Sequence, residues 1–284
     1  MEINKVGVVG CGQMGAGITQ ICAQAGYQVV TSEINSELLN KGMKFIESRL
    51  SRDVEKERIS QQEKDSIISR IEGTTNIKDF ANCDLMIEVA IENMDLKKKI
   101  FAELDKICPQ HAILATNTSC LSIIDIAMAT GKPDKVLGLH FFNPVPVMKL
   151  LEIVKTIATS DETLEAGQAF GKSLGKTIVI AQDTPGFIVN CLLIPYLLNA
   201  IRMLNAGVAT KEDIDTGINL GLNHPMGPLA LSDLIGNDTV LFIANALYDE
   251  FKEAQYAPPS LLRKMVTAGW LGRKTGKGFY EYNK

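Results

Sequence analysis

The sequence predicts an α/β protein in two parts, with an N-terminal doubly wound sheet followed by an all-α C-terminal region. Two observations lead to this prediction. Short β-branched segments alternate with helical patterns from residue 5 to residue 181, as in parallel strands joined by crossover helices. After residue 188 the apolar residues recur at helical spacing. We therefore expect two domains, over residues 1–185 and 186–284.

Composition excludes several classes of function. The formal net charge of −4 argues against a nucleic-acid-binding surface. Because no apolar segment is long enough to span a bilayer, we expect no membrane partner. The six cysteines are scattered and form no CxxC pair, so neither a disulfide framework nor a metal site is expected. Reduced thiols indicate a cytoplasmic protein.

A glycine-rich turn follows the first predicted strand. The strand covers residues 5–9 and leads into Gly10-x-Gly12-x-x-Gly15, after which a helical pattern begins. In a dinucleotide-binding unit, Gly10 permits the tight turn and Gly12 lets a diphosphate approach the main chain. Gly15 lets the helix pack close to the strand, and the helix N-terminus faces the phosphates. This context predicts a Rossmann-type domain that binds a dinucleotide.

Glu33 follows the second predicted strand, residues 28–31, at the spacing that such units use for a carboxylate. A carboxylate at this position binds the adenosine ribose hydroxyls and repels a 2′-phosphate, so NAD is favoured over NADP. The small side chains of Thr31 and Ser32 leave some use of NADP open. Considered alone, Glu33 is equally compatible with a solvated charge at a strand end.

Residues 36–71 predict two long helices in an antiparallel pair that protrudes from the sheet. This is more helix than one crossover needs. The cations of the segment either form a solvated face, which is the more common arrangement, or bind phosphates of a large substrate. They are Lys41, Lys44, Arg49, Arg52, Lys56 and Arg58.

Polar side chains follow the next predicted strands, residues 84–90, 112–116 and 136–141, where those strands end. Ligands of open α/β sheets bind at this carboxyl edge. Asn117 to Ser119 could instead cap the next predicted helix, residues 122–129. The side chains expected at the edge are Glu92, Lys97, Asn117, Ser119 and His140.

His140 and Glu152 lie on two predicted strands that are separated by a loop with two prolines. A return of the chain through this loop can bring Glu152 beside His140. A single histidine in an apolar strand is more often a core residue than a catalyst. Together at the ligand edge, the two residues are equally compatible with catalysis and with a structural role.

A last strand over residues 176–181 and a turn over 183–187 precede the helical region. Asn190 lies on the first turn of a long apolar helix. It either caps or packs that helix, or it binds a substrate carbonyl. We expect the active site in the cleft between the two domains.

The sequence resembles the L-3-hydroxyacyl-CoA dehydrogenase family over nearly the whole chain. Within the family, it is most similar to the short bacterial members that act on 3-hydroxybutyryl-CoA, in butyrate and fatty acid metabolism. Besides the glycine turn, the segments that carry the resemblance are NTSCLSI from residue 117, GLHFFNPVPVMKLLEI from 138, DTPGFIVNCLLIPYLLNAI from 183, EDIDTGINLG from 212, HPMGPLALSD from 224 and GRKTGKGFYEY from 272.

The resemblance implies a role for each matching position. His140 matches the acid/base catalyst, and Glu152 matches the glutamate that orients its ring. Ser119 and Asn190 match residues that contact the 3-oxygen and thioester region of the substrate, and Lys56 matches a contact to coenzyme A phosphates. The dinucleotide contacts that it implies are Gly10, Gly12, Gln13, Met14, Gly15, Glu33, Glu92, Lys97, Ser119, Asn143 and Lys274. Cys120 and Glu33 depart from the serine and aspartate of many relatives.

The implied reaction is the reversible oxidation of (S)-3-hydroxybutyryl-CoA to acetoacetyl-CoA, by hydride transfer to NAD or NADP. A homodimer or higher homo-oligomer through the C-terminal domain is expected. One alternative is a related β-hydroxy acid dehydrogenase, which would use a lysine and lack the His–Glu pair. The other is a non-catalytic NAD-binding protein on this fold, which would have lost one of the four catalytic residues, whereas all four are present.

Overall fold

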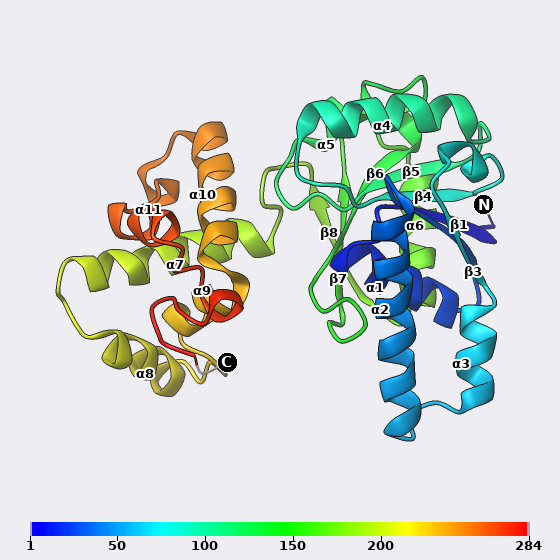
Figure 1. Cartoon of the computed structure of the whole chain (residues 1–284). Helices are drawn as coiled ribbons and strands as arrows, with labels where there is room; N and C mark the ends of the chain where they lie inside the picture. The colour runs from blue at the N-terminus through cyan, green and yellow to red at the C-terminus, as the bar shows by residue number, and fades with distance from the viewer. Residues whose placement is uncertain (1, 283–284) are drawn as a thin grey trace. The chain divides into compact units, whose positions relative to one another are not determined.

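The computed structural model describes residues 2–282 and divides into two compact units (Figure 1). The N-terminal unit is Met1–Thr184 and the C-terminal unit is Pro185–Lys284. The division falls within the turn at residues 183–187, where strand patterns give way to helical ones. The predicted fold class, a doubly wound sheet followed by an all-α part, is confirmed.

The N-terminal unit contains one eight-stranded sheet in the order β3-β2-β1-β4-β5-β6-β7-β8. Neighbouring strands are parallel except β6 and β7, which pair antiparallel. The direction in which strands are added reverses between β1 and β4, which is where open sheets bind ligands. The strands are β1 (Lys5–Val9), β2 (Gln28–Ser32), β3 (Ile71–Thr74), β4 (Leu85–Glu88), β5 (Ile113–Thr116), β6 (Val136–Phe141), β7 (Leu150–Lys155) and β8 (Thr177–Gln182).

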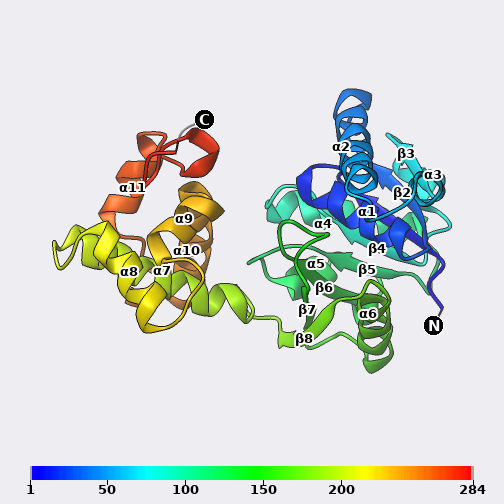
Figure 2. The ribbon, with the colours of Figure 1, turned by 90° about the horizontal axis from the view of Figure 1, so that it is seen from below.

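Helices cover both faces of this sheet, which buries the apolar strands between them (Figures 1 and 2). Helices α1 and α6 pack on one face, and α4 and α5 pack on the other. The six α-helices of the described N-terminal unit are α1 (Gln13–Gln24), α2 (Ser36–Glu55), α3 (Gln61–Ile68), α4 (Met94–Ile107), α5 (Ile123–Ala127) and α6 (Asp161–Ser173).

Helices α2 and α3 form the predicted pair that protrudes from the sheet (Figure 1). Asn35 caps α2 by accepting a hydrogen bond from the main-chain N–H of Leu38. Ser60 and Glu63 form a capping box that starts α3. The prediction of two long helices is right for α2, with 20 residues, and wrong for α3, with eight. Helix α3 begins only after the capping box at Ser60, and the chain then enters β3, a strand that the sequence did not predict.

The C-terminal unit is built from helices, as predicted. Its longest helix buries one apolar face, which includes Ile194, Leu198 and Ile201. The helices of its described residues are α7 (Val189–Asn205), α8 (Lys211–Gly221), α9 (Pro228–Ile235), α10 (Asn237–Phe251) and α11 (Ser260–Thr267). Between residues 2 and 282, none of the helices combines the length and the apolar character needed to cross a membrane.

Two buried carboxylates fix the end of the chain onto these helices. Asp233 accepts hydrogen bonds from the main-chain N–H groups of Phe279 and Tyr280, both at 2.9 Å. Asp215 accepts a bond from the Tyr280 hydroxyl at 3.0 Å. Burial and the neighbouring Asp215 raise the pKa of Tyr280, so its hydroxyl stays a donor. The C-terminal segment that contains Lys274 and Tyr280 is therefore fixed to α8 and α9 by charge-assisted hydrogen bonds.

Candidate active site at the carboxyl edge of the sheet

The glycine turn between β1 and α1 has the geometry that a diphosphate requires. Gly10 has φ +103°, a conformation that favours glycine. A Cβ at Gly15 would lie 1.8 Å from the carbonyl oxygen of Gly10, so only glycine lets α1 pack this closely. A Cβ at Gly12 would meet nothing within 4 Å, so this side of the turn is open. No side chain caps α1 at Gly12, which leaves its first N–H groups available to bind an anion.

Glu33 lies across the glycine turn. Its Oε1 accepts a hydrogen bond from the main-chain N–H of Cys11 at 2.8 Å, and its Oε2 accepts one from Ile34 at 3.2 Å. A cavity of about 560 Å³ adjoins it, lined by residues that include Gly12, Glu33 and Phe45. A carboxylate, an open glycine and an aromatic ring in one cavity fit a ribose, a phosphate and a base. The residues present therefore fit an adenine dinucleotide.

His140 and Glu152 lie directly opposite each other on β6 and β7. Nδ1 of His140 donates to Oε2 of Glu152 across 2.6 Å. The histidine is 4% exposed and the glutamate 0%, so the pair is desolvated. The ring of Phe142 lies 4.6 Å from the imidazole and limits its movement. The structure thus brings together two residues that the sequence could only suggest as neighbours.

The loop over residues 142–149 joins these two strands and carries Asn143. Its side-chain oxygen accepts a hydrogen bond from Nε2 of Gln13, at the start of α1, across 3.2 Å. The peptide bond between Asn143 and Pro144 is cis. Two residues that the sequence assigns to the dinucleotide site, 130 positions apart, are therefore in contact.

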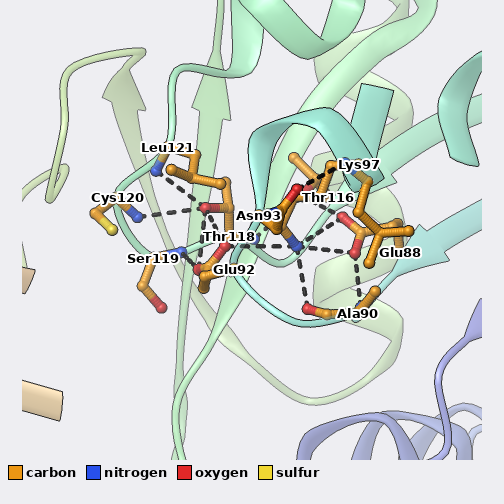
Figure 3. A network of polar contacts seen from close by, with 11 residues as sticks. Glu88, Ala90, Glu92, Asn93, Lys97, Thr116, Thr118, Ser119, Cys120 and Leu121 are labelled. Carbon is orange, nitrogen blue, oxygen red and sulfur yellow. Dashed lines mark hydrogen bonds and ion pairs between the residues drawn. The ribbon is translucent and has the colours of Figure 1, made fainter. Parts of the chain in front are cut away.

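Glu92 fixes the loop that carries Ser119 (Figure 3). The glutamate accepts hydrogen bonds from the main-chain N–H of Ser119 at 2.7 Å and from the Thr118 hydroxyl at 2.9 Å. In Figure 3 the Ser119 side chain points away from this network. Asn117 accepts a bond from the main-chain N–H of Phe141. Because Ser122 caps α5, residues 117–119 do not cap this helix, and that alternative is wrong.

Glu88 and Lys97 form a second buried ion pair in the same network (Figure 3). Nζ of Lys97 lies 2.8 and 2.9 Å from the two carboxylate oxygens of Glu88, and it also donates to the carbonyl of Ala90 at 3.2 Å. Lys97 is 1% exposed and Glu88 is 0% exposed. Thr116 donates to the same carboxylate at 2.8 Å. These partners enclose the ammonium. A direct contact of Lys97 with a dinucleotide stays a prediction.

The other predicted site residues lie further along the chain. Lys56 follows α2 and lines a cavity of about 410 Å³ together with Arg49 and Arg52. In the C-terminal unit, Asn190 is buried in the first turn of α7, and Lys274 forms an ion pair with Asp238 at 2.6 Å. Met14 packs partly against the core of the N-terminal unit, so its main chain is the part suited to a diphosphate.

Two family profiles match the chain. The NAD-binding domain of 3-hydroxyacyl-CoA dehydrogenase matches residues 5–184, and the C-terminal domain of 3-hydroxyacyl-CoA dehydrogenase matches residues 186–282. The chain belongs to the 3-hydroxyacyl-CoA dehydrogenase family. The resemblance seen in the sequence is confirmed, and residues 5–184 are the NAD-binding domain of this oxidoreductase.

Relatives of this family match the chain along its whole length. A probable 3-hydroxybutyryl-CoA dehydrogenase of Bacillus subtilis is 46% identical over 284 residues, which cover 100% of this chain and 99% of that protein. The 3-hydroxybutyryl-CoA dehydrogenase of Mycobacterium tuberculosis is 47% identical over 282 residues, with 99% of each chain covered. Solved structures of M. tuberculosis FadB2 and of (S)-3-hydroxybutyryl-CoA dehydrogenase PaaH1 from Ralstonia eutropha match with TM-scores of 0.97 and 0.96. Each is 46% identical, and each alignment covers 100% of both chains.

The sequence of this 3-hydroxyacyl-CoA dehydrogenase also contains patterns that indicate the second ion pair, although they were not part of the prediction. Glu88 interrupts an apolar strand, where a carboxylate requires a buried partner. Lys97 shares a helix face with Phe101 and Leu104, both of which are buried, whereas Lys98 does not. Together, these two patterns indicate that Lys97 points inward as the partner of Glu88.

Proposed function

We propose that this protein catalyses the reversible oxidation of (S)-3-hydroxybutyryl-CoA to acetoacetyl-CoA, with NAD as the hydride acceptor. The observation that carries the proposal is the buried His140–Glu152 pair, on the same sheet as the open glycine turn. Relatives that bear the name 3-hydroxybutyryl-CoA dehydrogenase match the chain from end to end, which supports the choice of substrate.

His140 is the acid/base catalyst in this proposal. Because its Nδ1–H donates to Glu152, Nε2 is the nitrogen that exchanges a proton with the 3-oxygen of the substrate. In oxidation Nε2 accepts the hydroxyl proton, and in reduction the imidazolium returns it. The carboxylate of Glu152 stabilises the imidazolium and fixes the ring. NAD, when bound, supplies the hydride acceptor.

Ser119 and Asn190 bind the substrate oxygens. Hydrogen bonds from these side chains to the 3-oxygen and thioester region would stabilise the charge that develops there. The bond from the Ser119 N–H to Glu92 supports this role, since it fixes the loop that presents the serine. The position of Asn190 in the first turn of α7 gives its amide a rigid base.

The dinucleotide lies against the glycine turn, with its diphosphate at Gly10, Gly12 and the N-terminus of α1. Glu33 binds the adenosine ribose hydroxyls and favours NAD over NADP. The open face of Gly12 and the cavity beside Glu33 support this arrangement. The other proposed contacts are Gln13, Met14, Gly15, Glu92, Lys97, Ser119, Asn143 and Lys274.

Coenzyme A phosphates bind at the basic cavity beside the end of α2. Lys56, Arg49 and Arg52 line this cavity, and Asp53 contributes a carboxylate that pairs with Arg58 at 3.1 Å. Cations therefore outnumber carboxylates, and guanidinium groups suit phosphate oxygens. Replacing Lys56 by methionine would raise the KM for acetoacetyl-CoA without a matching change for NADH.

The protein is a cytoplasmic homodimer that associates through its C-terminal unit. Large apolar side chains are exposed in that unit, among them Leu192, Leu220 and Leu222. Their exposure supports the proposed interface, because a second copy of the chain would cover apolar surface. Analytical ultracentrifugation at micromolar concentration is expected to give a dimer, and a monomer would refute this part of the proposal.

The proposed activity is tested by following NADH oxidation with acetoacetyl-CoA. Free acetoacetate and NADPH serve as parallel comparisons. Rapid turnover of the thioester with NADH, and little with free acetoacetate, is expected. Preference for the free acid would instead favour a β-hydroxy acid dehydrogenase, and NADH binding without turnover would favour a non-catalytic protein.

A further inference from the structure

Lys176, the residue before β8, is bonded to the loop over residues 142–149. Its ammonium donates to the main-chain carbonyl of Val145 at 2.6 Å and to that of Met148 at 2.7 Å. These carbonyls lie 31 and 28 residues earlier in the chain. One side chain from the edge strand β8 thus reaches the loop between His140 and Glu152.

A lysine is an unusual choice for this position if its only role is packing. Burial lowers the pKa of Lys176, and the nearby Cys22 partly opposes this shift. Both of its hydrogen-bond acceptors are neutral carbonyls. The two bonds are short and charge-assisted, which makes them strong and directional. Such bonds specify the position of the loop, which an apolar side chain of similar length would not do.

The loop is fixed to α1 at the other side by two further contacts. A Cβ at Gly17 would lie 2.9 Å from Cβ of Val145, so α1 and the loop are in close contact. Nε2 of Gln13 donates to the side chain of Asn143 at 3.2 Å. The carbonyl of Val145, which Lys176 holds, is only two residues from Asn143. A shift at Val145 is therefore transmitted to Asn143.

We propose that Lys176 is a positioning residue that keeps Asn143 in place for the dinucleotide. This inference rests on the proposed function, in which Asn143 contacts NAD. Lys176 acts through the carbonyls of Val145 and Met148, and its larger effect is on the affinity for the dinucleotide.

The first test compares three variants of the full-length enzyme. Lys176→Met keeps the length of the side chain and removes its donors, and it is expected to raise the KM for NADH about fivefold to tenfold. The KM for acetoacetyl-CoA should change less than about twofold. Lys176→Arg keeps a charged donor and should restore part of the NADH affinity. Lys172→Met, in the exposed last turn of α6, is the matched control and should leave both constants unchanged.

The second test combines Lys176→Met with Asn143→Ala. If Lys176 acts through Asn143, the double variant raises the KM for NADH no more than Asn143→Ala alone. Melting curves and circular dichroism establish that each variant is folded. A lower Tm for Lys176→Met with an unchanged KM for NADH would make Lys176 purely structural and overturn the inference. An unchanged KM for NADH in Asn143→Ala would instead refute the cofactor contact on which the inference rests.

Discussion

Two buried ion pairs involve glutamates on strands of the same sheet, and the two pairs differ in the residue that faces the glutamate. In the Glu88–Lys97 pair, the ammonium contacts both carboxylate oxygens and the carbonyl of Ala90. The carboxylate also accepts from Thr116. In the His140–Glu152 pair, a contact of 2.6 Å joins Nδ1 of the ring to one carboxylate oxygen.

The difference supports the proposal that the first pair is structural and the second is catalytic. Lysine and glutamate side chains normally keep their charges at neutral pH, whereas histidine gains or loses a proton there. The Glu88–Lys97 pair is therefore suited to hold β4 and α4 together. The His140–Glu152 pair is suited to transfer a proton, because Glu152 supports both states of the ring. Burial and ion pairing alone do not identify a catalyst.

The largest effect on catalysis is expected for His140→Gln. Without a proton donor and acceptor at this position, kcat for acetoacetyl-CoA reduction should fall roughly 10³-fold. The Kd for NADH, measured by fluorescence, should stay within about twofold of the wild-type value. A variant with near-normal turnover would contradict the assignment of His140.

The largest effect on stability is expected for Lys97→Met. The variant leaves the carboxylate of Glu88 buried without its cation, which should lower the free energy of unfolding by about 3–5 kcal/mol. Lys98→Met is the matched control, because Lys98 is exposed and lies 3.8 Å from Asp125. The control should change the stability by less than about 1 kcal/mol in urea unfolding. Equal losses in the two variants would show that burial of Lys97 has no energetic consequence.

A smaller catalytic effect is expected for Glu152→Gln. The amide can still accept a hydrogen bond from His140, but it carries no charge to stabilise the imidazolium. We expect kcat to fall about 10²-fold, and the pH profile of reduction to move to lower pH. Steady-state rates across a pH series measure both changes. An unchanged profile would show that the carboxylate does not act on the ring.

The smallest expected effect is a difference in reactivity between two cysteine thiols, those of Cys120 and Cys191. Burial, followed by the nearby Glu92, raises the pKa of Cys120 to about 12, so little of its reactive thiolate forms at neutral pH. Cys191 in the C-terminal unit is partly exposed. Iodoacetamide at about pH 8, followed by mass spectrometry, should label Cys191 well before Cys120. Faster labelling of Cys120 would show that the Ser119 loop opens in solution.

Elements with strong local patterns were predictable from the sequence. The strands β6 and β7 begin and end at the predicted residues, because their apolar segments are bounded by turns and prolines. The β3 strand was missed because its four residues include Gly73 and an exposed Glu72, neither of which is typical of a strand. Its pairing to β2 is a tertiary contact that no local pattern encodes.

The sequence predicted which residues belong to the candidate site, but it predicted only part of the contacts between them. The glycine turn and Glu33 follow from spacing, because one local motif carries them. The contact between Gln13 and Asn143 joins segments 130 residues apart and depends on how the sheet is assembled. The pairing of Lys97 with Glu88 depends on how α4 packs against β4, and the contact of Lys97 with a dinucleotide stays a prediction.

The most direct test of the central claim is a double-mutant cycle on kcat/KM for acetoacetyl-CoA reduction. It compares His140→Gln, Glu152→Gln and the double variant with the wild-type enzyme. If the two residues form one acid/base unit, the double variant is no slower than His140→Gln alone, since Glu152 acts only through the ring. If the two losses multiply in the double variant, Glu152 contributes independently of His140, and the account of the pair is wrong.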